Sequence, residues 1–151
     1  MPNVSNIRFN ETEDVSLKYA MEPRSKRGVI NLYNMIGCAT GCRPLSYKGY
    51  GCYCGFMGSG FAVDDIDRCC QKHDSCYGWA NCPLSGMVYI VPYFWKCVYD
   101  QPHCAIDHSI FGGRDSCASK LCECDRQLSL CLQRHSCPQS RPFCTSSPFS
   151  K

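Results

Sequence analysis

The chain has 151 residues, of which 16 are cysteine, and a formal net charge of +3. This length fits one compact domain of ordinary size. The cysteine density is typical of secreted proteins held by disulfides, and the scattered basic residues give no support for nucleic-acid binding.

The cysteine spacing favours disulfides over metal-thiolate sites. The adjacent pair Cys69-Cys70 and the Cys-x-Cys pairs 52/54 and 122/124 do not match the Cys-x2-Cys spacing of zinc sites. The even count permits eight bridges with no free thiol. We therefore expect a secreted, extracellular protein.

The first residues do not themselves provide a membrane or export signal. No apolar run reaches the ~20 residues that span a bilayer, and residues 1–20 lack the apolar stretch of a signal peptide. Met1 then either follows a removed signal or is an artificial start.

Residues 1–27 differ in composition from the rest of the chain. They contain no cysteine, carry N-glycosylation sequons at Asn3 and Asn10, and end in the basic run RSKR. This ending suits a processing protease of the secretory pathway, so we interpret 1–27 as a pro-segment cleaved after Arg27. The alternative is a solvated charged linker. Residues 28–151 then form the mature domain.

Residues 28–37, GVINLYNMIG, predict a short amphipathic helix. Val29, Leu32, Tyr33 and Ile36 recur at helical spacing. Packing in a hydrophobic core explains this stripe as well as a binding role does.

The segment YGCYCGFMGSG, residues 50–60, predicts a sharply bent loop that could surround a ligand. It has four glycines, with Met57 where a fifth would ease the bend. With a carboxylate from a helix packed against it, its backbone carbonyls would offer oxygen ligands suited to Ca²⁺, although an EF-hand would carry its acids within the loop. The alternative is a purely structural glycine turn.

Residues 64–79, DDIDRCCQKHDSCYGW, predict a helix with acidic residues at its start and no glycine before Gly78. Cys69, His73 and Tyr77 would share one face, and Cys70 and Asp74 would lie about 100° around it. His73 would then point into a cleft, and Asp74 toward the glycine-rich segment.

The rest of the chain predicts a hairpin, a loop, a second long helix and a tail. Residues 87–99 are aromatic and β-branched, with Pro92 suited to an edge or turn. We expect an exposed loop over 103–117, a helix from about Ser116 to Gln133, and from about 132 an irregular tail pinned by disulfides.

His73 is the candidate general base. A histidine with a pKa near ~6.5 accepts a proton at neutral pH when a carboxylate orients its ring. Asp125, within LCECDR of the second long helix, is the candidate for that carboxylate. A solvated His-Asp pair at 73 and 74 is the alternative, because adjacent His and Asp are common.

Taken together, YGCYCGFMGSGFAVDDIDRCCQKHDSCY and CECDR closely resemble the secreted phospholipase A2 family. The likeness extends from Gly28 to roughly Leu132. It implies a mainly α, disulfide-rich fold with two long antiparallel disulfide-linked helices, a short N-terminal helix, a calcium-binding loop and a small two-stranded β-wing.

The resemblance also implies calcium-dependent hydrolysis of the sn-2 ester of glycerophospholipids at a membrane or micelle surface. His73 would activate a water, oriented by Asp125, to which Tyr77 and Tyr93 would hydrogen-bond. One Ca²⁺ would be bound by the carbonyl oxygens of Tyr53, Gly55 and Met57 and by the Asp74 carboxylate. The Gly55 N–H would help to stabilise the oxyanion. Substrate-channel positions would be Val29, Leu32, Ile36, Tyr47 and Tyr89, the last near the lipid phosphate.

By the same resemblance, six disulfides would be Cys38–Cys97, Cys54–Cys70, Cys69–Cys131, Cys76–Cys124, Cys82–Cys117 and Cys104–Cys122. Cys42 and Cys52 would each pair with one of the tail residues Cys137 and Cys144, in an order that the sequence leaves open.

The chain departs from the family pattern at places that do not touch His73, Asp74 or Asp125. The stretch from Cys104 to Cys117 is longer than usual, Ala62 replaces a common proline, and the Cys42 bridge is additional. Met57 does touch the loop. A positive φ there would weaken Ca²⁺ affinity, whereas a negative φ would leave its side chain to face the lipid.

A noncatalytic relative, such as a receptor-binding toxin or a calcium-binding matrix protein, is the alternative function. Inactive relatives often lack the calcium carboxylate, and Asp74 is present, which favours an enzyme. Because family members use a free N-terminal amine to order the first helix, the uncut precursor is a candidate zymogen. Nothing in the sequence indicates an oligomer.

Overall fold

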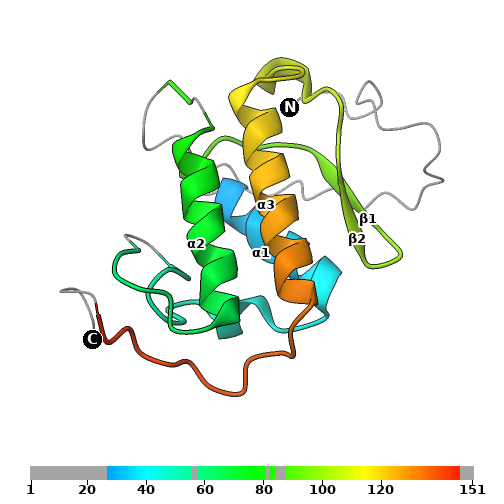
Figure 1. The fold of residues 1–151 in the computed structure, drawn as a ribbon. Helices are drawn as coiled ribbons and strands as arrows, with labels where there is room; N and C mark the ends of the chain where they lie inside the picture. Colours follow the sequence, from blue (N-terminus) through cyan, green and yellow to red (C-terminus); the bar gives the residue numbers. More distant parts are fainter. Residues whose placement is uncertain (1–26, 56–57, 81, 84–87, 147–151) are drawn as a thin grey trace.

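The computed structural model describes residues 27–55, 58–80, 82–83 and 88–146. The pro-segment before Arg27, its two sequons and Met57 lie outside the described residues. The described part contains the helices α1 (Arg27–Thr40), α2 (Asp65–Gly78) and α3 (Cys117–Gln133), the strands β1 (Trp95–Val98) and β2 (Gln101–Cys104), and the short 3-10 helices η2 (Pro44–Tyr47) and η4 (Ser109–Phe111). The mainly α, disulfide-rich fold with a two-stranded sheet is confirmed (Figure 1).

The helices begin at side-chain caps. The Asp64 carboxylate accepts the N–H of Asp67 at the start of α2, and the Ser116 hydroxyl accepts the N–H of Ser119 at the start of α3. Each cap satisfies an N–H that has no partner within its own helix. Both helices lie within a residue of their predicted bounds, whereas α1 continues to Thr40, beyond the predicted end at 37.

The helices α2 and α3 lie side by side and run antiparallel (Figure 1). Cys69 near the start of α2 bonds to Cys131 near the end of α3, and Cys76 near the end of α2 bonds to Cys124. Cys70, on a different side of α2, bonds instead to Cys54 in the glycine-rich segment. The adjacent cysteines Cys69 and Cys70 thus fix the rotation of α2 about its own axis between α3 and that segment.

All eight disulfides are formed, and the described residues contain no free cysteine. The six pairs expected from the family resemblance are confirmed. The open pairing is settled as Cys42–Cys137 and Cys52–Cys144. Residues 134–146 form no helix, and their one β-type pairing is the isolated bridge between Gly51 and Phe143. This agrees with the predicted irregular tail held by disulfides.

The hairpin lies later in the chain than predicted. The prediction placed it over 87–99, but β1 and β2 pair antiparallel from Trp95↔Cys104 to Val98↔Gln101. The turn residues Tyr99 and Asp100 both have positive φ, at 50° and 62°. Tight hairpin turns require this conformation, and usually Asn or Gly supplies it. Because Tyr-Asp lacks that signal, the sequence did not reveal the turn.

The prediction of an exposed loop over 103–117 is wrong in two respects. His103 and Cys104 belong to β2, and the loop turns inward at Ala105 and His108, which are both buried. The His108 ring stacks near Phe94 and its Nδ1 accepts the Phe94 N–H at 2.9 Å. The loop is therefore anchored to the segment that precedes β1.

The helix α1 presents two different stripes. Asn31, Met35 and Ala39 are buried against the rest of the molecule, whereas Val29 and Leu32 are only partly buried. Of the sequence-based stripe, Ile36 is buried in the hydrophobic core, and Leu32 and Tyr33 pack against that core while staying partly exposed. None of the described helices is long and apolar enough to cross a lipid bilayer.

Candidate active site

His73 and Asp125 meet between α2 and α3. His73 Nε2 lies 2.6 Å from Asp125 Oδ1. Asp125 is completely buried, and its carboxylate also accepts the hydroxyls of Tyr77, at 2.6 Å, and Tyr93. A buried carboxylate needs such donors to offset its lost hydration. With Nε2–H directed at Asp125, the other ring nitrogen of His73, Nδ1, keeps its lone pair.

The two tyrosines act as permanent donors to Asp125. Burial, reinforced by the nearby Asp125 carboxylate, raises the pKa of Tyr77 and of Tyr93 well above the ordinary value of 10. Both phenols therefore stay protonated at any physiological pH. Asp125 in turn keeps a fixed position against His73, because three donors, two on α2 and one in the segment before β1, hold its two oxygens.

A largely apolar cavity of about 290 Å³ opens beside His73. It is bounded by α1, η2, the glycine-rich segment and the facing sides of α2 and α3. Ten of the predicted site residues line it: Val29, Leu32, Ile36, Tyr47, Tyr53, Gly55, His73, Asp74, Tyr77 and Tyr89. Asp125 and Tyr93 stand behind His73 rather than at the cavity wall, which suits their expected roles.

Asp74 projects from α2 toward the glycine-rich segment. Among the described residues no side chain donates a hydrogen bond to it, and burial raises the pKa of its carboxyl to about 6. Gly58 packs so closely that a Cβ there would lie 2.5 Å from Asp74 Oδ2 and 2.6 Å from Cδ1 of Tyr53. The segment therefore wraps the carboxylate in a space that only glycine leaves open.

This arrangement fits a calcium ion. The described residues contain no group of three His, Cys, Asp or Glu side chains, so most ligands would have to be backbone oxygens. Asp74 supplies one hard anionic oxygen, and a cation beside it would favour its charged form. Tyr53 and Gly55 lie at the same cavity. Met57, the third predicted carbonyl, lies outside the described residues.

The Gly55 N–H donates to the Tyr53 carbonyl oxygen at 2.9 Å. The predicted oxyanion donor and one predicted calcium ligand are thus hydrogen-bonded to each other. Both atoms are in place beside the cavity, but each is engaged by the other rather than turned toward a ligand.

The sequence did not point to several residues at the site. Lys48 and Gly58 line the cavity, as do Leu128 and Leu132 of α3. The two leucines follow Asp125 at helical spacing, a signal that was available. Asp67 was also missed. It is fully buried in the first turn of α2 and shares the i, i+3, i+7 side of the helix with Cys70 and Asp74.

Comparison with known proteins identifies the family. The family model described as Phospholipase A2 matches residues 29–141, which include every predicted site residue. The chain belongs to the phospholipase A2 family. Acidic phospholipase A2 E of Naja oxiana is 42% identical over 106 residues, covering 68% of this chain and 84% of that protein.

Proposed function

We propose that this phospholipase A2 family member is a secreted, calcium-dependent enzyme. It hydrolyses the sn-2 ester of glycerophospholipids and releases a fatty acid and a lysophospholipid. The observation that carries the proposal is the buried Asp125 carboxylate, which holds His73 beside an apolar cavity while Asp74 faces the same space. A purely structural protein gains nothing from keeping all three in this arrangement.

The chemistry assigned to His73 follows from its two nitrogens. Nε2–H is held by Asp125, so Nδ1 is the atom that takes a proton from a water in the cavity. The water oxygen bonds to the ester carbonyl carbon as the proton moves to His73. The imidazolium, stabilised by Asp125, then returns this proton to the departing glycerol oxygen as the ester bond breaks. No covalent enzyme intermediate forms.

The calcium site would consist of the Asp74 carboxylate and the carbonyl oxygens of Tyr53, Gly55 and Met57. When bound, the ion supplies positive charge that stabilises the developing oxyanion. For Gly55 to donate its N–H to that oxyanion, and for Tyr53 to offer its carbonyl, their mutual hydrogen bond has to open. Loop rearrangement on binding is therefore part of the proposal.

The half-buried apolar stripe of α1 gives the cavity its lipid character. Val29 and Leu32, with Ile36 and Tyr47 deeper in, provide a wall for an acyl chain, and Tyr89 lies at the cavity toward the expected phosphate. The natural partner is a phospholipid membrane or micelle surface, bound peripherally.

The proposal includes export and processing. The cysteine content and the eight disulfides favour an oxidising extracellular environment. Cleavage after Arg27 by a processing protease would free residues 28–151 as the active domain, with the uncut form as a zymogen. Comparing vesicle hydrolysis before and after cleavage tests this, and equal rates would reject it.

The decisive test of the enzyme is fatty acid release from phosphatidylcholine vesicles. We expect release with Ca²⁺, loss of release with a chelator, and a fall of at least ~10³-fold in His73→Gln, because the general base and its orientation are both lost. His135→Gln, a change outside the cavity, is the matched control and should keep full activity.

Two results would contradict the proposal. Release that survives either the chelator or His73→Gln would reject the mechanism. Absence of release in the wild-type protein cleaved after Arg27, with Ca²⁺ still binding, would favour the noncatalytic alternative of a receptor-binding or calcium-binding protein on the same scaffold.

A further inference from the structure

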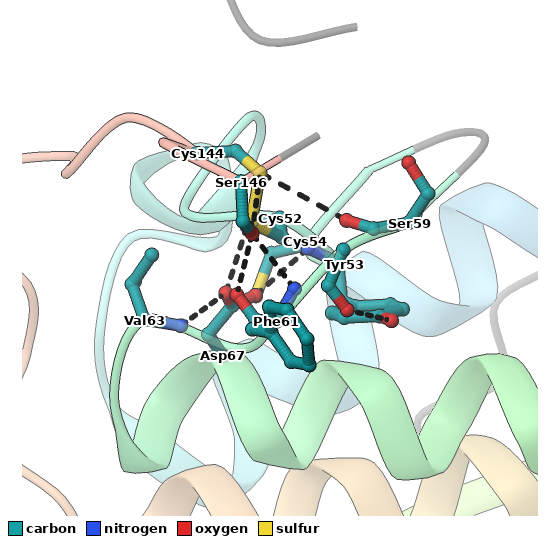
Figure 2. The surroundings of a disulfide bond; sticks show 10 residues. Cys52, Tyr53, Cys54, Ser59, Phe61, Val63, Asp67, Cys144 and Ser146 are labelled. Atoms are coloured by element: carbon teal, nitrogen blue, oxygen red, sulfur yellow. Dashed lines mark hydrogen bonds between the residues drawn. A yellow bond between two sulfur atoms is a disulfide. The ribbon is translucent and has the colours of Figure 1, made fainter. Parts of the chain in front are cut away.

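Asp67 is a buried charge that the proposed chemistry does not use. It lies in the first turn of α2, and none of its side chain is exposed. Its carboxylate accepts backbone N–H groups from Cys52 at 2.7 Å, Tyr53 at 2.8 Å and Val63 at 2.9 Å (Figure 2). Backbone donors of this kind hold a buried carboxylate in one place and offset its lost hydration.

The three donors lie on both sides of the middle of the glycine-rich segment. Cys52 and Tyr53 are near its start and Val63 follows its end at Gly60, so one carboxylate ties the chain on both sides to α2. The Tyr53 N–H is bonded to Oδ1, whereas Cys52 and Val63 share Oδ2. Both carboxylate oxygens are therefore needed, and the position of Tyr53 is set directly by Asp67.

Asp67 and Asp74 lie two turns apart on one side of the same helix. Asp67 holds the backbone of Tyr53, and the ring of Tyr53 packs with Asp74 around Gly58. The rigid helix thus fixes the separation between two predicted calcium ligands, one held through Asp67 and one carried by α2 itself.

Gly51 shows how tightly the carboxylate is enclosed. Its φ is +61°, and a Cβ at this position would overlap the Asp67 side chain. On the far side, the C-terminal tail holds the same segment through Cys52–Cys144 and through the Gly51 N–H, which donates to the Pro142 oxygen at 2.9 Å. In Figure 2 the segment lies between Asp67 and this tail.

We propose that Asp67 is a positioning residue for the calcium site. By anchoring Cys52, Tyr53 and Val63 to α2, it holds the backbone on both sides of the loop in place for Ca²⁺ binding, without touching metal or substrate. This inference rests on the proposed function only for the identity of the ion. The anchoring of the loop is a property of the metal-free chain and is measurable there.

The test replaces the carboxylate by its amide. Asp67→Asn keeps the shape but turns an NH₂ group against at least one backbone N–H. We expect Ca²⁺ affinity, measured by calorimetry without lipid, to fall roughly 10- to 100-fold, the usual range for residues that support metal ligands.

Asp65→Asn is the matched control on the same helix. Asp65 is exposed and pairs with Arg68 at the surface, so its removal should leave Ca²⁺ affinity unchanged. Equal Ca²⁺ affinity in Asp67→Asn and Asp65→Asn would overturn the proposal, even if Asp67→Asn also melts at a lower temperature.

A second measurement separates this inference from the proposed function. In metal-free protein, Asp67→Asn should speed hydrogen exchange at the amides of Cys52, Tyr53 and Val63 but not at those of α3. If the wild type bound no Ca²⁺, the proposed function would fail, but the exchange rates would still show whether Asp67 anchors the loop. Unchanged exchange at the three amides would reject that anchoring.

If Asp67→Asn does not fold, a pair of glycine variants replaces it. Gly51 and Gly49 both have positive φ, so alanine is strained at each, but only a Cβ at Gly51 meets Asp67; at Gly49 it meets nothing within 4 Å. Gly51→Ala should therefore weaken Ca²⁺ binding clearly more than Gly49→Ala. Equal weakening would count against a role for Asp67.

Discussion

Gly58 lies where Tyr53 and Asp74 come together. We expect Gly58→Ala to weaken Ca²⁺ binding by tenfold or more, equivalent to about 1.4 kcal/mol, because its Cβ would sit 2.5 Å from Asp74 Oδ2. The backbone at Gly58 is not in the left-handed region, so the effect would be steric displacement of the carboxylate rather than strain. Calorimetric titration with Ca²⁺ measures it.

Gly113→Ala provides the control for this substitution. A Cβ at Gly113 meets nothing within 4 Å, so the variant should bind Ca²⁺ like the wild type. If Gly58→Ala also bound Ca²⁺ normally, the closeness of Gly58 to Asp74 would have no bearing on the ion.

At the scale of residues, the helix period predicted correctly which elements the two candidate site residues of α2 face. His73 and Asp74 are adjacent in sequence and face different elements, α3 and the glycine-rich segment, as expected from their phase on a helix. Asp67 follows the same period but was passed over, because an acidic residue in a first turn ordinarily serves the helix dipole in solvent. Only its burial and its three backbone donors indicate a different role.

The loop between β2 and α3 depends on an uncharged histidine. Burial lowers the pKa of His108 to about 4, although the neighbouring Asp107 acts in the opposite direction. The neutral ring accepts the Phe94 N–H through Nδ1, which a protonated ring cannot do. His108 has no exposed surface, so a protonated ring would be a buried charge.

The sign of the resulting pH dependence follows from the two states. In the unfolded chain His108 titrates near 6.5, and in the folded chain near 4, so acid favours unfolding between these values. The stabilisation is complete above pH ~6.5 and is lost as pH falls toward 4, by about 3 kcal/mol. Unfolding free energies of the wild type at pH 7 and 4.5 measure most of this change.

His108→Asn isolates the histidine contribution. The Asn oxygen can accept the Phe94 N–H and does not titrate, so the variant should lose about 2 to 3 kcal/mol less than wild type between these pH values. His135→Asn, beyond the end of α3, should retain the wild-type pH dependence. An identical acid loss in His108→Asn and wild type would contradict the assignment.

At the scale of elements, periodic segments were predictable and turns were not. The helices α2 and α3 carry local signals at every turn, including their caps. The hairpin was displaced because Tyr99-Asp100 adopts its turn without glycine, held by the pairing of β1 with β2 and by Cys104–Cys122. Such a turn depends on contacts that local sequence does not contain.

At the scale of the whole molecule, two disulfides, Cys42–Cys137 and Cys52–Cys144, enclose nearly the same stretch of chain. Cys42 and Cys137 are 95 residues apart, a separation for which a lone bridge contributes about 4.7 kcal/mol in the chain-entropy model. Cys52–Cys144 closes almost the same loop. With that bridge intact, Cys42–Cys137 closes a remaining loop of roughly 15 residues, for which the model gives about 3 kcal/mol.

We therefore expect replacement of both Cys42 and Cys137 by serine to lower the free energy of unfolding by about 3 kcal/mol. Denaturant unfolding at neutral pH measures the change, and Ca²⁺ affinity should be little affected because Cys52–Cys144 still holds the glycine-rich segment. A loss near 4.7 kcal/mol would show that the two bridges act independently.

The sequence by itself determined the fold class and the two long helices and brought out His73, Asp74 and Asp125 as candidate site residues, because these depend on spacing within single helices and on motifs a few residues long. Tertiary structure alone decided how Cys42 and Cys52 pair with the tail, where the hairpin turns, and that Asp67 anchors the glycine-rich segment. The physical reason is distance along the chain. Which distant groups meet, and which charge is buried with donors around it, is set by packing of the whole molecule.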